Sequence, residues 1–310
     1  MQGTPNWRLG LLFASTTAAA WGCLPIALKT MLMYMDPYTI TWYRFLVSAI
    51  VAALVLRATG GLPRLGRLRP RSRGVLLVAV LGLIGNYLLY LIGLSFASPG
   101  STQVLIQLAP MFLLVGGLVI FRESFSTVQW LGLATLLGGL GLFFHDRFPA
   151  MIDLDADLGK GVFLIVLASL VWAIYAIAQK ILQLEMSPQG ILLVIYVSAS
   201  IALLPTADPA ALVSLTPWTL ALLAFCSLNT LVAYGAFAEA LRHWEASRVS
   251  AVLAVTPLLT LGFGVLLASL PTGYVNEDPS DPTSLAGAAL VVVGSAVTAL
   301  GGMRRRPATD

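Results

Sequence analysis

Residues 145–160 read His-Asp-Arg-Phe-Pro-Ala-Met-Ile-Asp-Leu-Asp-Ala-Asp-Leu-Gly-Lys, and this polar stretch divides the chain. It carries four acids and separates two long apolar halves that resemble each other in pattern. We interpret it as the hinge between two copies of one unit.

The two halves match at several positions that are separated by a nearly constant number of residues. The separation is 147 to 155 residues in every pair: Trp21 and Trp172, Lys29 and Lys180, Pro110 and Pro257, Gly132 and Gly287, Gly139 and Gly294. This agreement indicates a duplication. Internal repeats in a hydrophobic chain are typical of transporters, whose binding site lies where the repeats meet.

The composition is that of a membrane protein. Of the 310 residues, 58% are apolar and 10% are charged, and the mean hydropathy is +0.88. The first apolar run after Arg8 is long enough to span a bilayer, so we expect a retained helix and not a cleaved signal peptide. Cys23 and Cys226 lie in apolar segments, which supports neither a disulfide framework nor a thiolate metal site. The net charge of +4 resides mostly in short loops, where it indicates membrane topology and not nucleic-acid binding.

A spanning helix needs about 20 apolar residues, and ten segments qualify. Five precede the polar stretch, at 9–28, 37–57, 74–95, 99–121 and 127–144. Five follow it, at 161–181, 188–205, 216–238, 247–270 and 284–302. The expected fold is an all-α integral membrane protein of ten transmembrane helices, built as two five-helix repeats.

Arginine and lysine are concentrated on one side of this arrangement. The loop at 57–73, Arg242, Arg248 and residues 304–306 lie on the side of the two termini, whereas most acids lie on the other side. Because positive charge favours the cytoplasmic side, both termini are predicted to be cytoplasmic. Five is an odd number, so the second repeat crosses the membrane in the opposite sense to the first, which is the inverted-repeat design.

Proline and glycine recur at matching places in the two halves. Pro110 and Pro257 each lie inside a span, where proline removes a backbone donor and kinks the helix. Paired kinks are candidates for paired gates, although membrane helices also tolerate proline without such a role. Gly132, Gly139 and their counterparts are spaced to lie on one helix face, which favours close helix contact.

Polar and aromatic side chains inside the spans form stripes at helical spacing. The candidates for substrate binding are Asn86, Tyr87 and Tyr90 in the third span, Gln103 and Gln107 in the fourth, Trp172 and Tyr175 in the sixth, and Asn229 in the eighth. Packing or a membrane-interface belt is the alternative for any one of them. The whole set predicts a cavity lined by rings and amides, which suits an aromatic or apolar solute with a few polar groups.

Two charged residues near the spans are assigned gating or structural roles. Arg44 in the second span is expected to snorkel to the outer interface beside Trp42 and Tyr43; the alternative is a partner for a substrate carboxylate. Glu123, at the end of the fourth span, is expected to form a structural ion pair.

Several motifs together carry a family resemblance: Trp21-Gly22-x-x-Pro25-x-x-x-Lys29, the arginine in the second span, and Arg122-Glu123 after the fourth. With the duplicated unit they resemble the drug/metabolite transporter superfamily, and within it the ten-helix EamA-type exporters, most closely those of aromatic amino acids. The similarity covers nearly the whole chain. It implies EamA-like repeats at 1–146 and 160–310, joined by a periplasmic acidic linker at 147–159, in the bacterial inner membrane. The chain departs from the pattern at 274–281, where an acidic insert replaces a short loop.

The resemblance implies export of amino acids, aromatic and other apolar ones, and of related metabolites by alternating access. The expected partners are a small-molecule substrate and the lipid bilayer; no cofactor, metal or nucleic acid is expected, and the protein is expected to be a monomer. A membrane-embedded enzyme would need converging catalytic groups, and the two histidines, His145 and His243, lie at span ends. A transporter of sugar phosphates or nucleotide sugars would need several buried Lys or Arg.

The energy source is predicted from what the spans contain. The sequence has no Gly-x-x-x-x-Gly-Lys-Ser/Thr phosphate loop for ATP hydrolysis. Every Asp and Glu falls in a loop or near a span end, whereas proton coupling uses an ionisable group within the membrane. We therefore predict facilitated, downhill movement. The alternative is a proton-coupled drug or metabolite exporter in which Glu123 titrates.

Overall fold

The structure is a computed structural model that describes residues 6–121, 126–244, 246–270, 274–276 and 278–301. Across these residues it contains helices and no strand. Seven segments of this described part are long and apolar enough to cross a membrane, and two shorter apolar helices, Thr127–Phe143 and Pro188–Leu203, accompany them. The prediction of an all-helical membrane protein is confirmed, whereas the count of ten spans stays a prediction.

The helices follow the predicted segments closely. The first half contains α1 (Trp7–Met31), α2 (Pro37–Ala58), α3 (Pro70–Phe96), α4 (Pro99–Leu105), α5 (Leu108–Phe121) and α6 (Thr127–Phe143). The short helix α7 (Phe148–Ile152) lies in the linker. The second half contains α8 (Asp157–Leu182), α9 (Pro188–Leu203), α10 (Pro217–His243), α11 (Ala246–Leu253), α12 (Thr256–Ala268) and α13 (Pro282–Gly301). Short 3-10 turns occupy Leu65–Arg67, Leu204–Thr206 and Pro209–Ser214.

Local sequence explains where many of these helices begin. In four of them a capping side chain accepts a backbone N–H of the first turn and the next residue is proline: Asp36-Pro37, Ser98-Pro99, Ser187-Pro188 and Thr216-Pro217. Proline suits the first helical position because its missing N–H would have no partner there. Ser126 and Gln129 form a reciprocal capping box at the start of α6.

Two of the predicted spans are broken helices. The segment at 99–121 breaks between α4 and α5, just before Pro110, and the segment at 247–270 breaks between α11 and α12, just before Pro257. Each proline lacks the N–H that would continue the helix. The Ala109 amide instead donates to the Ile106 carbonyl at 2.9 Å, and the Thr256 hydroxyl donates to the Leu253 carbonyl. The predicted kinks at matching places are confirmed, and their role as hinges stays a prediction.

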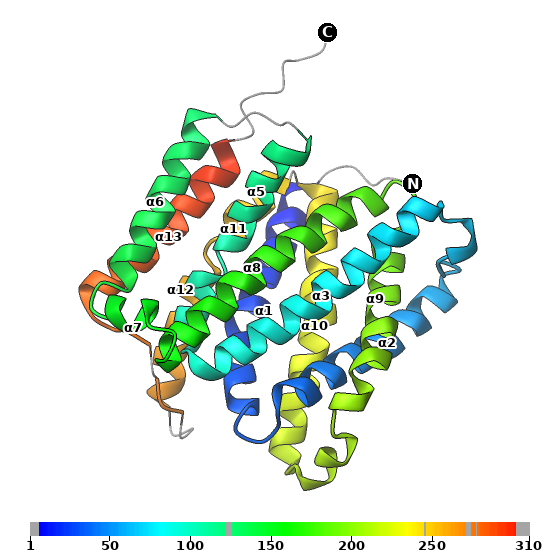
Figure 1. Cartoon of the computed structure of the whole chain (residues 1–310), viewed down its shortest axis with the longest axis horizontal. Helices are drawn as coiled ribbons and strands as arrows, with labels where there is room; N and C mark the ends of the chain where they lie inside the picture. Colours follow the sequence, from blue (N-terminus) through cyan, green and yellow to red (C-terminus); the bar gives the residue numbers. More distant parts are fainter. Residues whose placement is uncertain (1–5, 122–125, 245, 271–273, 277, 302–310) are drawn as a thin grey trace.

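The main packing contacts join helices of the two halves. The first helix of each half packs on the third spanning helix of the other, which pairs α1 with α10 and α8 with α3. The second helices, α2 and α9, pair with each other at one edge of the molecule, and the last helices, α6 and α13, pair at the opposite edge (Figure 1). The broken spans meet through α4 and α12. The pairs α1 with α10 and α3 with α8, α2 with α9, and α6 with α13 map onto one another when the two halves are exchanged.

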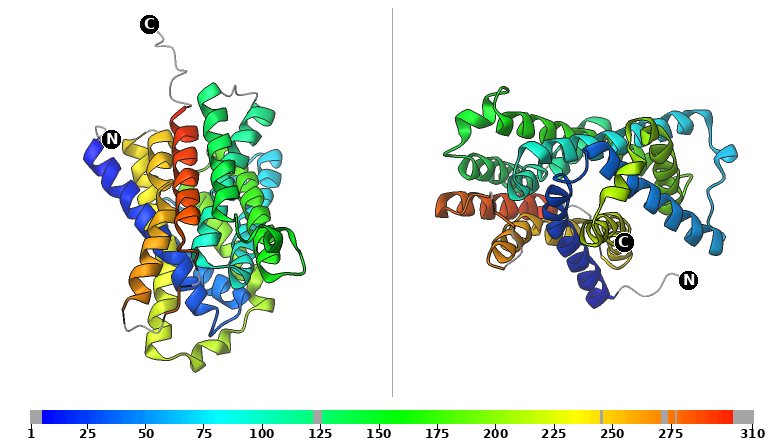
Figure 2. Two further views of the ribbon diagram at one scale, coloured as in Figure 1. Left: turned by 90° about the vertical axis from the view of Figure 1, so that its left-hand side faces the viewer. Right: turned by 90° about the horizontal axis from the view of Figure 1, so that it is seen from below.

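The bundle has two distinct ends (Figure 2). We call the end where α1 begins and α13 finishes the terminal end, and the end that carries residues 144–156 the linker end. At the terminal end the Asn6 amide donates to Nδ1 of His243 at 3.4 Å, and the Ser126 hydroxyl donates to the Gly301 carbonyl at 3.1 Å.

Glycine allows the close approach of α6 and α13. A Cβ added at Gly139 would lie 2.6 Å from the Val291 amide nitrogen, and one at Gly294 would lie 2.7 Å from the Gly132 carbonyl oxygen. Both distances are shorter than a van der Waals contact allows. The prediction that these glycines serve helix contact is confirmed. Apolar side chains such as Leu54, Leu81 and Leu131 point outward and are exposed, as expected for surfaces that face lipid.

Candidate functional site

An aromatic cluster lies where α2, α3, α8 and α9 meet. Tyr87 of α3, Tyr175 of α8 and Tyr196 of α9 are buried around Phe45 of α2. The ring centroids of Phe45 and Tyr87 are 4.6 Å apart, and those of Phe45 and Tyr196 are 5.9 Å apart. The close packing of α3 on α8 depends on Gly82, where a Cβ would lie 3.1 Å from the Tyr175 Cβ. The structure thus brings the predicted Tyr87 and Tyr175 together and adds Tyr196, which the sequence analysis missed.

Arg44 points into this cluster, so the prediction that it snorkels to the outer interface is wrong. Arg44 is buried, with only 4% of its surface exposed. The guanidinium carbon lies 4.6 Å from the centre of the Tyr87 ring, and Nη2 donates to Oγ1 of Thr230 on α10 at 3.2 Å. Helical spacing along α2 alone did not reveal these surroundings, because the Tyr87 ring and the Thr230 hydroxyl belong to α3 and α10.

Tyr90 and Gln103 extend the cluster toward the first broken span. The Tyr90 hydroxyl donates to Oε1 of Gln103 at 3.2 Å, which joins α3 to α4. Gln103 is buried. Trp172 is half-buried and packs against the edge of the aromatic cluster. All three were predicted to line one cavity, and they lie around the same group of helices.

Gln107 lies at the break of the first span and contacts the break of the second. Its Nε2 donates to the Ala254 carbonyl at 3.3 Å, and its Oε1 accepts from the Ser295 hydroxyl at 3.4 Å. Gln107 and Ala254 are 147 residues apart, the same offset as Pro110 and Pro257. The amide therefore bonds to the position that matches its own in the other half.

Two asparagines form equivalent hydrogen bonds between the halves. Nδ2 of Asn86 on α3 donates to the Ala168 carbonyl of α8 at 3.0 Å, and Nδ2 of Asn229 on α10 donates to the Ala20 carbonyl of α1 at 2.8 Å. Each asparagine thus links the third spanning helix of one half to the first helix of the other. Oδ1 of Asn229 is buried and has no hydrogen-bond partner among the described residues.

A second polar contact joins the insert between α12 and α13 to the start of α4, at the linker end of the bundle. Asp278, in the insert between α12 and α13, is buried, and its carboxylate accepts the Gly100 amide at 2.8 and 3.0 Å and the Ser101 amide at 3.3 Å. A Cβ at Gly100 would lie 2.7 Å from Oδ1 of Asp278, so the contact requires glycine there. Sequence analysis noted the acidic insert but missed that one of its acids binds α4. Glu123 lies outside the described residues.

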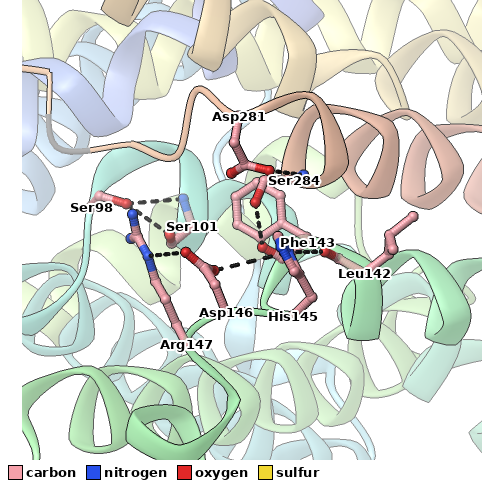
Figure 3. A network of polar contacts seen from close by, with 9 residues as sticks. All are labelled: Ser98, Ser101, Leu142, Phe143, His145, Asp146, Arg147, Asp281 and Ser284. Atoms are coloured by element: carbon pink, nitrogen blue, oxygen red, sulfur yellow. Dashed lines mark hydrogen bonds and ion pairs between the residues drawn. The ribbon is translucent and has the colours of Figure 1, made fainter.

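Figure 3 shows further contacts at the linker end. The Ser284 hydroxyl of α13 donates to the Phe143 carbonyl of α6 at 3.1 Å, and the Ser284 amide donates to Oδ1 of Asp281 at 2.9 Å. Asp146 lies 4.0 Å from both Arg147 and His145. The Ser284–Phe143 contact joins the start of α13 to the end of α6, and the ion pairs of Asp146 connect neighbouring residues at the start of the linker.

Two pockets lie away from the cluster, toward opposite ends of the bundle. One, of about 260 Å³, lies between the α2–α3 and α8–α9 loops, beside Arg64 and Glu185. The other, of about 310 Å³, lies between α12, Asn276 and the start of α13. Neither is lined by Arg44 or the tyrosines. Within the described ranges no group of three or more His, Cys, Asp or Glu side chains could hold a metal ion.

Comparison with known proteins identifies relatives along the whole chain. The model of the EamA-like transporter family matches twice, over residues 8–144 and 159–300. An uncharacterized transporter of Haemophilus influenzae is 39% identical over 293 residues, which cover 94% of this chain and 95% of the relative. The uncharacterized inner membrane transporter YhbE of Escherichia coli K12 is 40% identical over 294 residues, with coverage of 94% and 92%.

A solved structure shares the fold. A crystal structure of a protein superposes with a TM-score of 0.63 at 15% identity, covering 96% of this chain and 99% of the other. At this identity the likeness concerns the fold alone.

Proposed function

The chain belongs to the EamA-like transporter family, and from this premise we propose that it exports amino acids, aromatic and other apolar ones, and related metabolites. It is a multi-pass protein of the inner membrane. The sequence motifs resemble those of the aromatic amino acid exporter YddG most closely, and the proposed substrate class follows that likeness.

One observation carries the proposal: a buried group of tyrosines around a single arginine, at the junction of the two halves. Tyr87 belongs to the first half and Tyr175 and Tyr196 to the second, while Arg44 and Thr230 face each other across the same junction. Transporters built from repeats bind substrate at such a junction. Rings offer stacking surfaces to an aromatic or apolar side chain, and the polar groups orient it.

We propose ten spans in two inverted units, 1–146 and 160–310, with both termini in the cytoplasm and the linker 147–159 in the periplasm. Two observations support this arrangement: the family model matches each half separately, and the main helix pairs of one half have equivalents in the other. During alternating access the two units would separate and close at three places. These are the two proline breaks, the hydrogen bond from Gln107 to Ala254, and the contact of Asp278 with α4.

We propose further that movement is downhill. The described acids on the spanning helices, Asp157 and Glu239, lie near helix ends, so the central cluster offers no carboxyl group to carry a proton. Export then follows the higher substrate concentration inside the cell.

Liposomes that contain the purified protein and labelled L-phenylalanine test the proposal. We expect efflux faster than from protein-free liposomes, and unchanged by a protonophore. An imposed pH gradient without a substrate gradient should produce no accumulation. Concentrative uptake that a protonophore abolishes would refute the downhill mechanism. Efflux of L-phenylalanine, L-tryptophan and L-leucine no faster than from protein-free liposomes would refute amino acid export.

A further inference from the structure

Arg44 is a buried cation that has no anionic partner in the described part of the chain. Among the described residues no carboxylate forms an ion pair with it, and its Nε, which carries a hydrogen, has no hydrogen-bond partner. The acid nearest along its own helix is Asp36 at the N-cap of α2, eight residues away, or about 12 Å along the axis. The Tyr87 ring and the Thr230 hydroxyl contact the guanidinium but do not neutralise it.

A buried charge in a membrane protein is normally paired, because desolvation without a counter-charge is costly. The groups close enough to Arg44 to interact with it electrostatically include Tyr90, Tyr196 and Cys226, and none of these is an acid that is ionised at neutral pH. The charge that would balance Arg44 is therefore not supplied by the described part of the chain.

Two hydroxyls beside Arg44 are also without partners. Thr41 and Ser48 lie three residues before and four residues after Arg44, so all three side chains project from one face of α2. Both residues are fully buried, and neither hydroxyl oxygen has a hydrogen-bond partner among the described residues.

This is unusual for the chain. Serine and threonine within a helix commonly donate to the carbonyl four residues earlier. Ten others in the described helices do so: Thr16, Thr17, Thr30, Thr135, Ser169, Ser200, Ser227, Thr230, Thr260 and Thr298. Thr41 and Ser48 keep their hydroxyl hydrogens available.

We propose that Thr41, Arg44 and Ser48 form a binding site for the carboxylate of the substrate, with Tyr87, Tyr175 and Tyr196 around its apolar part. Three unpartnered donors on one helix face suit a carboxylate, which accepts up to about four hydrogen bonds. The described residues offer no acid at the cluster for an ammonium group. The site therefore recognises an apolar organic carboxylate, and the amino group is not required. This inference rests on the proposed function and narrows its substrate class.

Three ligands with the same phenyl ring test the inference on the purified full-length protein. L-Phenylalanine carries both charged groups, 3-phenylpropionate keeps only the carboxylate, and phenethylamine keeps only the amine. We expect the first two to raise the melting temperature in a concentration-dependent way and phenethylamine to leave it unchanged. Stabilisation by phenethylamine equal to that by 3-phenylpropionate would overturn the inference, as would no stabilisation by either carboxylate.

Variants locate the site. Arg44→Gln should weaken 3-phenylpropionate binding by more than about tenfold, because it removes the only cation of the cluster. Ser48→Ala should weaken binding several-fold without lowering the melting temperature of the unliganded protein, because it removes a buried polar group that has no partner. Ser169→Ala is the matched control, since its hydroxyl already bonds the Ile165 carbonyl, and it should leave the affinity unchanged.

The outcomes separate the two proposals. If Arg44→Gln does not fold, two experiments still test the carboxylate site: the ligand series on the unaltered protein and the comparison of Ser48→Ala with Ser169→Ala. Unchanged affinity in a folded Arg44→Gln protein overturns the inference even if amino acids are transported. Carboxylate binding that depends on Arg44, without amino acid efflux from liposomes, overturns the proposed function and leaves the inference standing.

Discussion

Single polar side chains hold helix ends and helix pairs of this protein in place. Nζ of Lys29 donates to the carbonyls of Leu94, Ser95 and Ala97, where α3 ends, at 3.0 to 3.2 Å. A lysine suits this position because the last carbonyls of a helix lack backbone donors and carry partial negative charge. Lys29 matches Lys180 of the second half, so one of the residues that revealed the repeat stabilises a helix end.

Glu185 is the carboxylate whose pH response the structure predicts most directly. It lies in the α8–α9 loop at the terminal end, where the Ser72 hydroxyl donates to it at 2.7 Å and Arg69 contacts it through its amide and its guanidinium. The Ser72 hydrogen bond, followed by the contacts of Arg69, holds the pKa of Glu185 below its ordinary value. The contact therefore stabilises the fold above the unfolded pKa, and this contribution is lost as pH falls through the lower folded pKa.

Comparison of the wild-type protein with Glu185→Gln measures this effect. The wild-type protein should melt at the higher temperature near neutral pH, and the difference should shrink toward zero as the pH falls below about 4, the ordinary range of a glutamate pKa. Ser72→Ala should reduce the same difference. A gap that is constant with pH, or that widens in acid, would contradict the assignment.

At the scale of the helix, α6 and α13 show how the two halves are joined by close backbone packing at glycines. Membrane helices gain little from apolar side chains that could equally contact lipid, so close backbone approach contributes most of the packing. Gly132 and Gly139 on α6 meet Gly287 and Gly294 on α13. Gly132 contacts Gly294 and Gly139 contacts Gly287, so each glycine meets the one that is not its own counterpart in the repeat.

Gly139→Ala should lower the free energy of unfolding by about 1 to 3 kcal/mol, because its Cβ would press on the backbone of α13. Gly141→Ala on the same helix is the matched control. No atom lies within 4 Å of a Cβ there, and alanine favours helix over glycine by about 1 kcal/mol, so it should be neutral or stabilising. Unfolding in detergent measures both; equal effects would contradict the close contact.

At the scale of the whole molecule, the two halves pack together mainly through three equivalent sets of helix pairs: α1 with α10 and α3 with α8, α2 with α9, and α6 with α13. The described chain begins and finishes its helices at the same end of the bundle (Figure 2). Basic loops lie at that end and the acidic linker lies at the other, and from this charge distribution we propose that the terminal end faces the cytoplasm.

Reporter fusions test this orientation. A phosphatase that is active only outside the cytoplasm should be silent when fused after the last residue and active when inserted in the linker near Asp155. The reverse pattern would contradict the orientation. Activity at both places would contradict the inverted arrangement of two five-helix units, which requires the linker and the C-terminus to lie on opposite sides.

The sequence by itself determined the elements of this protein. Apolar runs of membrane-spanning length predicted the helices, and the two matching prolines predicted kinks in two of them, because each of these signals acts within a short stretch of the chain. The repeat predicted that the helices belong to two equivalent sets. The motifs identified the family.

Only the tertiary structure decided what the side chains of those elements meet. Helical spacing states which residues share a face, but it does not state which helix lies opposite. Arg44 was expected at the membrane interface and is buried, since Thr230 and Tyr87 approach it from α10 and α3. Tyr196 and Asp278 escaped notice for the same reason: their partners, Phe45 and Gly100, are more than a hundred residues away in the sequence and become neighbours only when the two halves pack together.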